Sequence, residues 1–198
     1  TAEATARMNT ARRTLHGKLI SQMDLRRVDV RNMSEESLRQ STYEHFDTKR
    51  EIHVIPNFII PSEEGSSEYS QMRCKYAAPE EKILCHVSNF RKVKRVEDVV
   101  SVFAKVNEKI PSRLILVGDG PERHTIERMC REYGICSRVT FMGKVRDTSH
   151  VLEIADLFLL PSETESFGLA ALEAMAVGVP VISSNAGGIP EVNEHGVT

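Results

Sequence analysis

Residues 157–183 of the sequence are LFLLPSETESFGLAALEAMAVGVPVIS. An apolar run at 157–160 predicts a strand, an alanine-rich segment at 169–177 predicts a helix, and a second apolar run at 179–183 predicts another strand. A strand, a helix and a further strand in this order indicate a parallel pair, because the helical crossover returns the chain to the same end of the sheet. The stretch therefore predicts one βαβ unit.

The same alternation of short apolar runs and helical periodicity extends back to residue 82. Strands joined by right-handed helical crossovers form a parallel sheet with helices packed on both of its faces. The predicted fold class is thus α/β, a Rossmann-like parallel sheet flanked by helices. The helix at 96–107 has one apolar stripe, formed by Val96, Val99, Val100, Phe103 and Val106. Further strands are predicted at 83–87, 114–117 and 139–142, and further helices at 121–133 and 148–154.

Before residue 82 the pattern is less regular. Residues 1–30 suit only a weak amphipathic helix, to which we assign no function. The sequence opens at Thr1 without Met and ends at Thr198 in a turn-like stretch, so we expect it to be part of a longer protein. The remaining predictions are a helix at 34–46, a short strand at 52–55, and a loop or linker at 61–70.

The composition excludes several classes of protein. With 40% hydrophobic and 27% charged residues, the chain can bury a core of ordinary globular size. Lys and Arg number 26 against 28 Asp and Glu, so there is no basic excess for binding nucleic acid. The longest apolar stretch, 170–177, is far shorter than the roughly 20 residues that span a bilayer. We expect no nucleic-acid partner and no membrane span.

The cysteines and histidines do not indicate a metal site. The four cysteines lack the paired C-x-x-C spacing of a zinc site and are too few for a disulfide framework. None of the seven histidines has ligand spacing, and a structural or solvent-facing role is assigned to each. We expect reduced thiols in a cytoplasmic protein that needs no metal. The cysteines are Cys74, Cys85, Cys130 and Cys136.

The strongest candidate site is the end of one strand and the start of the next helix, at 162–176. Main-chain N–H groups in the first turn of a helix favour a bound anion. Glu165 lies just before the helix and Glu173 within it, so two carboxylates can face one ligand. Alternatively, Glu165 interacts with the helix dipole and Glu173 faces solvent. The four N–H groups are those of Ser166, Phe167, Gly168 and Leu169.

A second candidate site is the loop at 88–95, which follows a predicted strand directly. Ligands of parallel α/β sheets bind outside the carboxyl ends of the strands, and cations placed there can neutralise a pyrophosphate. Alternatively, the loop is a solvated basic surface. Its four cations are Arg91, Lys92, Lys94 and Arg95. The other loops at this edge of the sheet are 118–122, 143–147 and 183–190.

Together these motifs resemble the donor domain of the retaining GT-B glycosyltransferases of family 4. The basic loop comes first, then the Glu-x7-Glu element from Glu165 to Glu173, then AMAVGVPVI at 174–182 and GGIPE at 187–191. Each glycine turn alone is a weak signal, whereas the ordered set is specific. The resemblance begins at about Val28 and runs to the end of the sequence.

Within the family, two stretches are most similar to the members that transfer N-acetylglucosamine from UDP-GlcNAc to L-malate, the first step of bacillithiol biosynthesis. They are residues 86–100 and 116–122. The resemblance implies transfer without a metal and with retention at the anomeric carbon. The UDP-sugar is then a substrate, and no cofactor is implied.

The resemblance also implies roles for individual residues. It places Glu165 by the hydroxyls of the donor sugar, Glu173 at the ribose and Lys94 at the diphosphate, where it stabilises the leaving group. Many members carry a phosphate-binding arginine where this sequence has Asn89, and Arg91 is its substitute here. The remaining donor-site assignments are Asn89 itself, Lys144 and Val145 beside the uracil, and the N–H groups of Ser166, Phe167, Gly168 and Leu169.

The resemblance implies three regions in the chain. Residues 1–50 are a remnant of an N-terminal acceptor domain, 51–80 connect the domains, and 81–198 form the donor domain, incomplete at its C-terminal end. We expect no transfer by this chain alone. Two alternatives stay open, namely a family 4 enzyme with another acceptor or nucleotide sugar, and a noncatalytic α/β nucleotide-binding or partner-binding module. The oligomeric state is also open.

Overall fold

The computed structural model describes residues 35–46, 57–59 and 67–196. The chain divides into two compact units, Thr1–Pro56 and Asn57–Thr198. In the first unit the predicted helix at 34–46 is confirmed as α2, Glu35–Phe46. The predictions for residues 1–30 and 52–55 lie outside the described residues.

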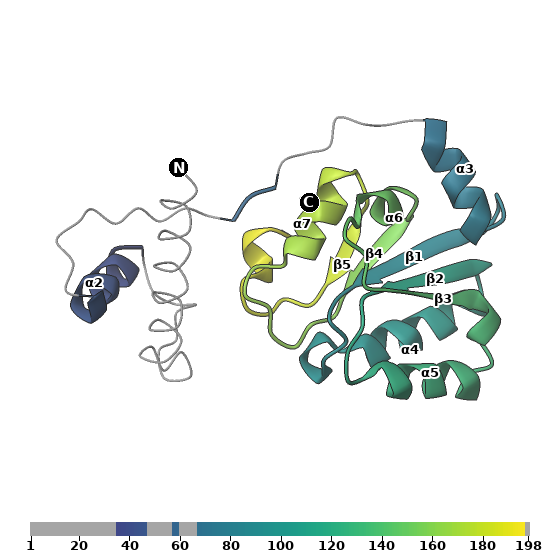
Figure 1. Ribbon diagram of the computed structural model, residues 1–198, viewed down its shortest axis with the longest axis horizontal. Coiled ribbons are helices and arrows are strands. Elements are labelled where there is room, and N and C mark those ends of the chain that lie inside the picture. The colour runs from purple at the N-terminus through teal and green to yellow at the C-terminus, as the bar shows by residue number, and fades with distance from the viewer. Residues whose placement is uncertain (1–34, 47–56, 60–66, 197–198) are drawn as a thin grey trace, which may run out of the picture. The chain divides into compact units, whose positions relative to one another are not determined.

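The second unit contains one parallel sheet with the strand order β3-β2-β1-β4-β5 (Figure 1). The backbone ladder between β1 and β2 runs from Lys82 opposite Ser112 to Val87 opposite Val117. The ladder between β1 and β4 is shorter and ends at Cys85 opposite Phe158. The strands are β1 Lys82–Val87, β2 Ser112–Val117, β3 Val139–Gly143, β4 Leu157–Leu160 and β5 Val181–Ser183.

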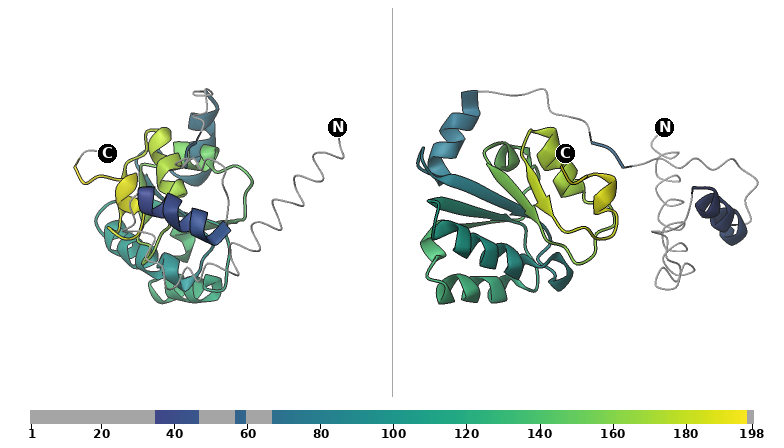
Figure 2. Two further views of the ribbon diagram at one scale, coloured as in Figure 1. Left: turned by 90° about the vertical axis from the view of Figure 1, so that its left-hand side faces the viewer. Right: turned by 180° about the vertical axis from the view of Figure 1, so that it is seen from behind.

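Helices cover both faces of the sheet, as the sequence predicts (Figures 1 and 2). On one face α4 and α5 pack on Leu84, Leu114 and Leu116, and on the other α6 and α7 pack on residues of alternate strand positions, such as Ile83 and Ile115. The α/β Rossmann-like fold class is therefore confirmed. The helices are α4 Val96–Asn107, α5 Arg123–Glu132, α6 Ser149–Glu153 and α7 Leu169–Ala176, with short 3-10 turns η2 Lys92–Lys94, η3 Cys136–Arg138 and η4 Ile189–Glu191.

The loop predicted at 61–70 is wrong at its C-terminal end, because α3 begins at Ser67 and runs to Tyr76. Met72 and Tyr76 pack on the same core cluster as α6 and α7. The guanidinium of Arg73 donates to the carbonyl oxygen of Ile154 at 2.5 Å and to a carboxylate oxygen of Asp156 at 2.8 Å. These tertiary contacts override the weak helical propensity of the serine-rich segment.

The loops after β1 and β2 touch through their backbones, which requires glycine. Gly118 has a φ of 120°, and a Cβ atom there would lie 1.7 Å from the carbonyl oxygen of Ser88. A Cβ atom at Gly120 would lie 2.1 Å from the carbonyl oxygen of Asn89. The two glycines thus let the second loop hold the first in place.

We expect Gly118→Ala to lower the free energy of unfolding by about 3 kcal/mol, because it combines backbone strain with a backbone collision. The control is Gly134→Ala, at a φ of 67° with nothing within 4 Å of the added Cβ. There, strain alone should cost about 1 kcal/mol. Urea denaturation of both variants measures the difference, and equal losses would contradict the close contact of the two loops.

Candidate functional site

The candidate site lies where the order of the strands reverses. From β1 the chain proceeds through β2 to β3 on one side, whereas β4 and β5 lie on the other side of β1. Loops that leave two neighbouring strands in opposite directions open a crevice at the carboxyl edge, which is where α/β sheets bind ligands. Here the crevice is bordered by the loops 88–95 and 161–168.

The loop after β1 turns sharply and then forms η2. Phe90 has a φ of 33°, which is unusual for a residue other than glycine, and its side chain is fully buried. The carbonyl oxygen of Val93 accepts a hydrogen bond of 2.8 Å from the amide of Glu163. The loop after β1 is thereby tied to the loop after β4.

The loop after β4 enters α7 through Gly168, which has a φ of 93° and directly precedes the helix. Its carbonyl oxygen accepts the amides of Ala171 and Leu172 at 2.9 and 3.1 Å. Gly187 and Gly188 pack against the backbone of this loop at Glu165. The amide of Gly188 donates a hydrogen bond of 2.8 Å to the carbonyl oxygen of Glu165. The first turn of α7 is thus placed at the crevice.

An ion pair joins the two loops across the strand reversal. Nζ of Lys94 lies 2.5 Å from Oε2 of Glu165, and the two side chains are only 19% and 14% exposed. The hydroxyl of the fully buried Ser162 donates to the same carboxylate oxygen at 3.1 Å. The structure therefore brings together two residues that lie 71 positions apart in the sequence.

The second predicted carboxylate, Glu173, has a different partner. Its Oε2 accepts a hydrogen bond of 3.1 Å from the hydroxyl of Thr148, at the end of the loop that contains Lys144 and Val145. Glu173 is half-buried, Lys144 is exposed, and Val145 packs against the core. Glu173 is therefore not a simple solvent-facing residue.

The remaining predicted residues lie nearer the surface. Asn89, Arg91 and Ser166 are exposed, Phe167 is half-buried, and Leu169 is 44% exposed at the start of α7. Of the other cations in the basic loop, Lys92 is exposed and Arg95 pairs with Asp98 at 2.8 Å.

Sequence reasoning missed the polar side chains behind the ion pair, which include Ser162, Ser88 and His86. His86 is fully buried, and its two ring nitrogens lie 2.8 Å from the carbonyl oxygen of Leu159 and 2.8 Å from Oγ of Ser88. Burial lowers the pKa of His86 to about 4. The charge of Lys94 also lowers it, whereas the contact with Leu159 and the charge of Glu165 raise it. The feature of the sequence that could have indicated this role is a histidine within an otherwise apolar predicted strand.

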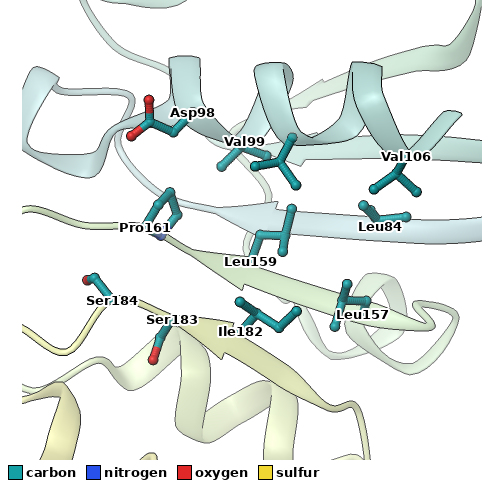
Figure 3. A pocket seen from close by; sticks show the side chains of 11 residues that line it. Leu84, Asp98, Val99, Val106, Leu157, Leu159, Pro161, Ile182, Ser183 and Ser184 are labelled. Atoms are coloured by element: carbon teal, nitrogen blue, oxygen red, sulfur yellow. The ribbon is translucent and has the colours of Figure 1, made fainter. Parts of the chain in front are cut away.

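An apolar hollow of about 250 Å³ lies between α4 and strands β4 and β5 (Figure 3). Leu84, Leu159 and Ile182 line it, and Ile182 is 60% exposed. A lining of this kind does not suit a diphosphate. The hollow is therefore not assigned to the diphosphate, although Pro161 at the start of the loop 161–168 also lines it.

Within residues 35–46, 57–59 and 67–196, no group of three His, Cys, Asp or Glu side chains could hold a metal ion. In the same residues, no helix is long and apolar enough to cross a membrane. Metal independence and a cytoplasmic location stay predictions.

These features define a class of protein, a Rossmann-like α/β domain with a buried ion pair at the reversal of strand order. Residues 70–198 match the family model described as Glycosyl transferases group 1, so the chain belongs to this family of glycosyltransferases. The family predicted from the motifs is therefore confirmed.

Similar proteins agree with this assignment. N-acetyl-alpha-D-glucosaminyl L-malate synthase of Bacillus anthracis is 46% identical over 171 residues, which are 86% of this chain and 45% of that protein. The structure of Anabaena Alr3699/HepE in complex with UDP and glucose is 28% identical, with a TM-score of 0.63, over 68% of this chain and 38% of that one.

The structure of WaaG, a glycosyltransferase involved in lipopolysaccharide biosynthesis, is 24% identical, with a TM-score of 0.65. It covers 81% of this chain and 45% of that one, and it supports the fold. This chain thus spans less than half the length of these three proteins.

The burial of His86 predicts a pH dependence of stability. Its pKa is lowered from 6.5 to about 4, so below pH 6.5 the unfolded chain takes up a proton that the folded chain does not. The stability that this group contributes is fully present above pH 6.5 and falls by about 3 kcal/mol as the pH drops to 4.

Urea denaturation between pH 7 and 4 measures this effect. We expect His86→Gln to lose about 3 kcal/mol less than the wild type over this range. His124→Gln, at a side chain that is 97% exposed, should follow the wild-type curve. Parallel curves for His86→Gln and the wild type would contradict a neutral, buried His86.

Proposed function

We propose that this chain carries the nucleotide-sugar site of a retaining glycosyltransferase that transfers N-acetylglucosamine from UDP-GlcNAc to L-malate, in the bacillithiol pathway. The observation that carries the site is the half-buried Lys94–Glu165 pair at the strand reversal, beside the start of α7. The similarity to the malate synthase supports the donor and the acceptor. The division into 1–50, 51–80 and 81–198 belongs to this proposal.

The site has charges of both signs where a nucleotide sugar needs them. Lys94 neutralises the diphosphate and stabilises the negative charge that grows on it as the bond to the sugar breaks. Glu165, held by Ser162, accepts hydrogen bonds from the sugar hydroxyls on the other side of that bond. Arg91 and Asn89 reach the diphosphate from the exposed part of the same loop.

The start of α7 and its carboxylate hold the rest of the donor. Unpaired N–H groups from Ser166 to Leu169 favour the diphosphate and the sugar, because the helix dipole adds about 0.3–1 kcal/mol for an anion there. Glu173 accepts hydrogen bonds from the ribose hydroxyls, beside the uracil at Lys144 and Val145. Retention requires the malate hydroxyl to attack C1 on the face that UDP leaves.

The acceptor must be brought to this site by residues other than those that hold the donor. Reaction needs the two substrates in contact and water excluded, which in two-domain enzymes follows from closure. We therefore expect no transfer from UDP-GlcNAc to malate by the 198 residues alone.

The first test is calorimetry of the chain with UDP, with GDP and NAD as comparisons. We expect UDP to bind selectively and Lys94→Ala to weaken binding by at least ten-fold, because a charge-assisted contact contributes about 1.5–3 kcal/mol. The control is Lys92→Ala, an exposed residue of the same turn. Preference for GDP would indicate another nucleotide sugar. No binding by the folded wild type would favour a noncatalytic module.

The two carboxylates should affect different parts of the donor. Glu173→Gln should weaken UDP and UDP-GlcNAc equally, by about ten-fold, because the ribose is common to both. Glu165→Gln should remove only the additional affinity of UDP-GlcNAc over UDP. Glu163→Gln, at an exposed position two residues earlier, is the control. Equal effects of Glu165→Gln on both ligands would contradict its assignment to the sugar.

A further inference from the structure

The buried histidine behind the ion pair has two defined partners. His86 is the penultimate residue of β1, with a side chain that is fully buried. Its Nδ1 lies 2.8 Å from the carbonyl oxygen of Leu159 in β4, and its Nε2 lies 2.8 Å from Oγ of Ser88. A buried ring with both nitrogens bonded can take only one orientation.

The chemistry of the partners fixes the direction of each hydrogen bond. A carbonyl oxygen can only accept, so Nδ1 of His86 carries the proton and donates it to Leu159. The ring is neutral, since burial lowers its pKa to about 4, and Nε2 is therefore an acceptor for the Ser88 hydroxyl. With its single proton directed at His86, the Ser88 oxygen accepts the amide of Phe90 at 3.3 Å.

This series of hydrogen bonds ends at the strained turn at Phe90, in the loop 88–95. The left-handed backbone at Phe90 costs free energy and persists only where its surroundings determine it. The Ser88 hydroxyl holds its amide, and the amide of Glu122 donates to its carbonyl oxygen at 3.0 Å. The turn thus has one hydrogen bond at each end of the Phe90 backbone.

His86 also joins β1 to β4 just beyond the end of their backbone ladder. The ladder between β1 and β4 ends at Cys85 opposite Phe158, one residue before His86 and Leu159. Directly beyond this point, Nδ1 of His86 contacts the carbonyl oxygen of Leu159. The imidazole therefore joins β1 to β4 where the ladder ends, on the side of the candidate site.

We propose that His86 is a positioning residue of the donor site, which acts through the Ser88 hydroxyl to set the turn at Phe90. That turn places Asn89 and Arg91, on either side of it, toward the nucleotide sugar. The proposal rests on the proposed function, because these two residues are donor groups only in a site that binds a nucleotide sugar.

The test is a double-mutant cycle of UDP affinity, measured by calorimetry on the 198-residue chain. His86→Phe keeps a ring without nitrogens, and Ser88→Ala removes the hydroxyl. We expect each variant to weaken UDP binding by about ten-fold and the double variant to be no weaker than either, because both changes break one chain of hydrogen bonds. Ser88→Thr, which keeps the hydroxyl, should restore most of the affinity.

A second measurement tests the hydrogen bonds of His86 in the absence of the nucleotide. Nitrogen NMR of His86 in the wild type should show a protonated Nδ1 and an unprotonated Nε2, and Ser88→Ala should shift the Nε2 resonance. His124→Phe and Ser101→Ala, away from the site, should leave UDP affinity unchanged. Thermal unfolding of each variant verifies that it is folded at the temperature of the titration.

The outcomes separate the two proposals. If the folded wild type binds UDP and either His86→Phe or Ser88→Ala binds it equally well, the positioning role is overturned and the proposed function stands. Additive losses in the double variant, or a protonated Nε2, also overturn the positioning role. If the folded wild type itself binds no UDP, the proposed function fails first and the positioning role with it.

Discussion

From β1 the chain runs toward one edge of the sheet, and from β4 it runs toward the other, so the chain leaves these two neighbouring strands in opposite directions. Every feature of the candidate site depends on this reversal of strand order. It places Lys94 and Glu165 on the loops that follow these two strands. Their ion pair of 2.5 Å joins the two loops. Without the reversal, the basic loop and the start of α7 would not face one ligand.

The loops after β1 and β4 are held in place by different kinds of contact. The loop after β1 is held by backbone contacts with Gly118 and Gly120 and by the buried imidazole of His86. The loop after β4 is held by the backbone at Gly187 and Gly188. Backbone packing of this kind tolerates no added Cβ, which explains why glycine turns follow the neighbouring strands β2 and β5. The residues of the candidate site therefore lie on segments whose shape is determined by backbone packing.

The sequence predicted the sheet and its four flanking helices because each has a strong apolar pattern, such as the valine stripe of α4. It failed at Ser67–Ser70, where the packing of later residues of α3, including Arg73, decides the local structure. Among site residues, Lys94 and Glu165 were predicted from their loops. Their direct pairing was not, because a contact 71 residues apart depends on strand order. Which hydroxyls and imidazoles support the pair also depends on packing that no local pattern records.

The Lys94–Glu165 pair explains how two charged groups of the candidate site can be largely buried. An isolated charge in this crevice would lose its hydration without compensation, whereas a pair compensates both partners. A diphosphate can then replace the carboxylate as the partner of Lys94, while the sugar hydroxyls and Ser162 satisfy Glu165. Both charges are already largely desolvated, so little further desolvation is needed when the donor enters. The ion pair is therefore compatible with the proposed donor, which is anionic at one end and rich in hydroxyls at the other.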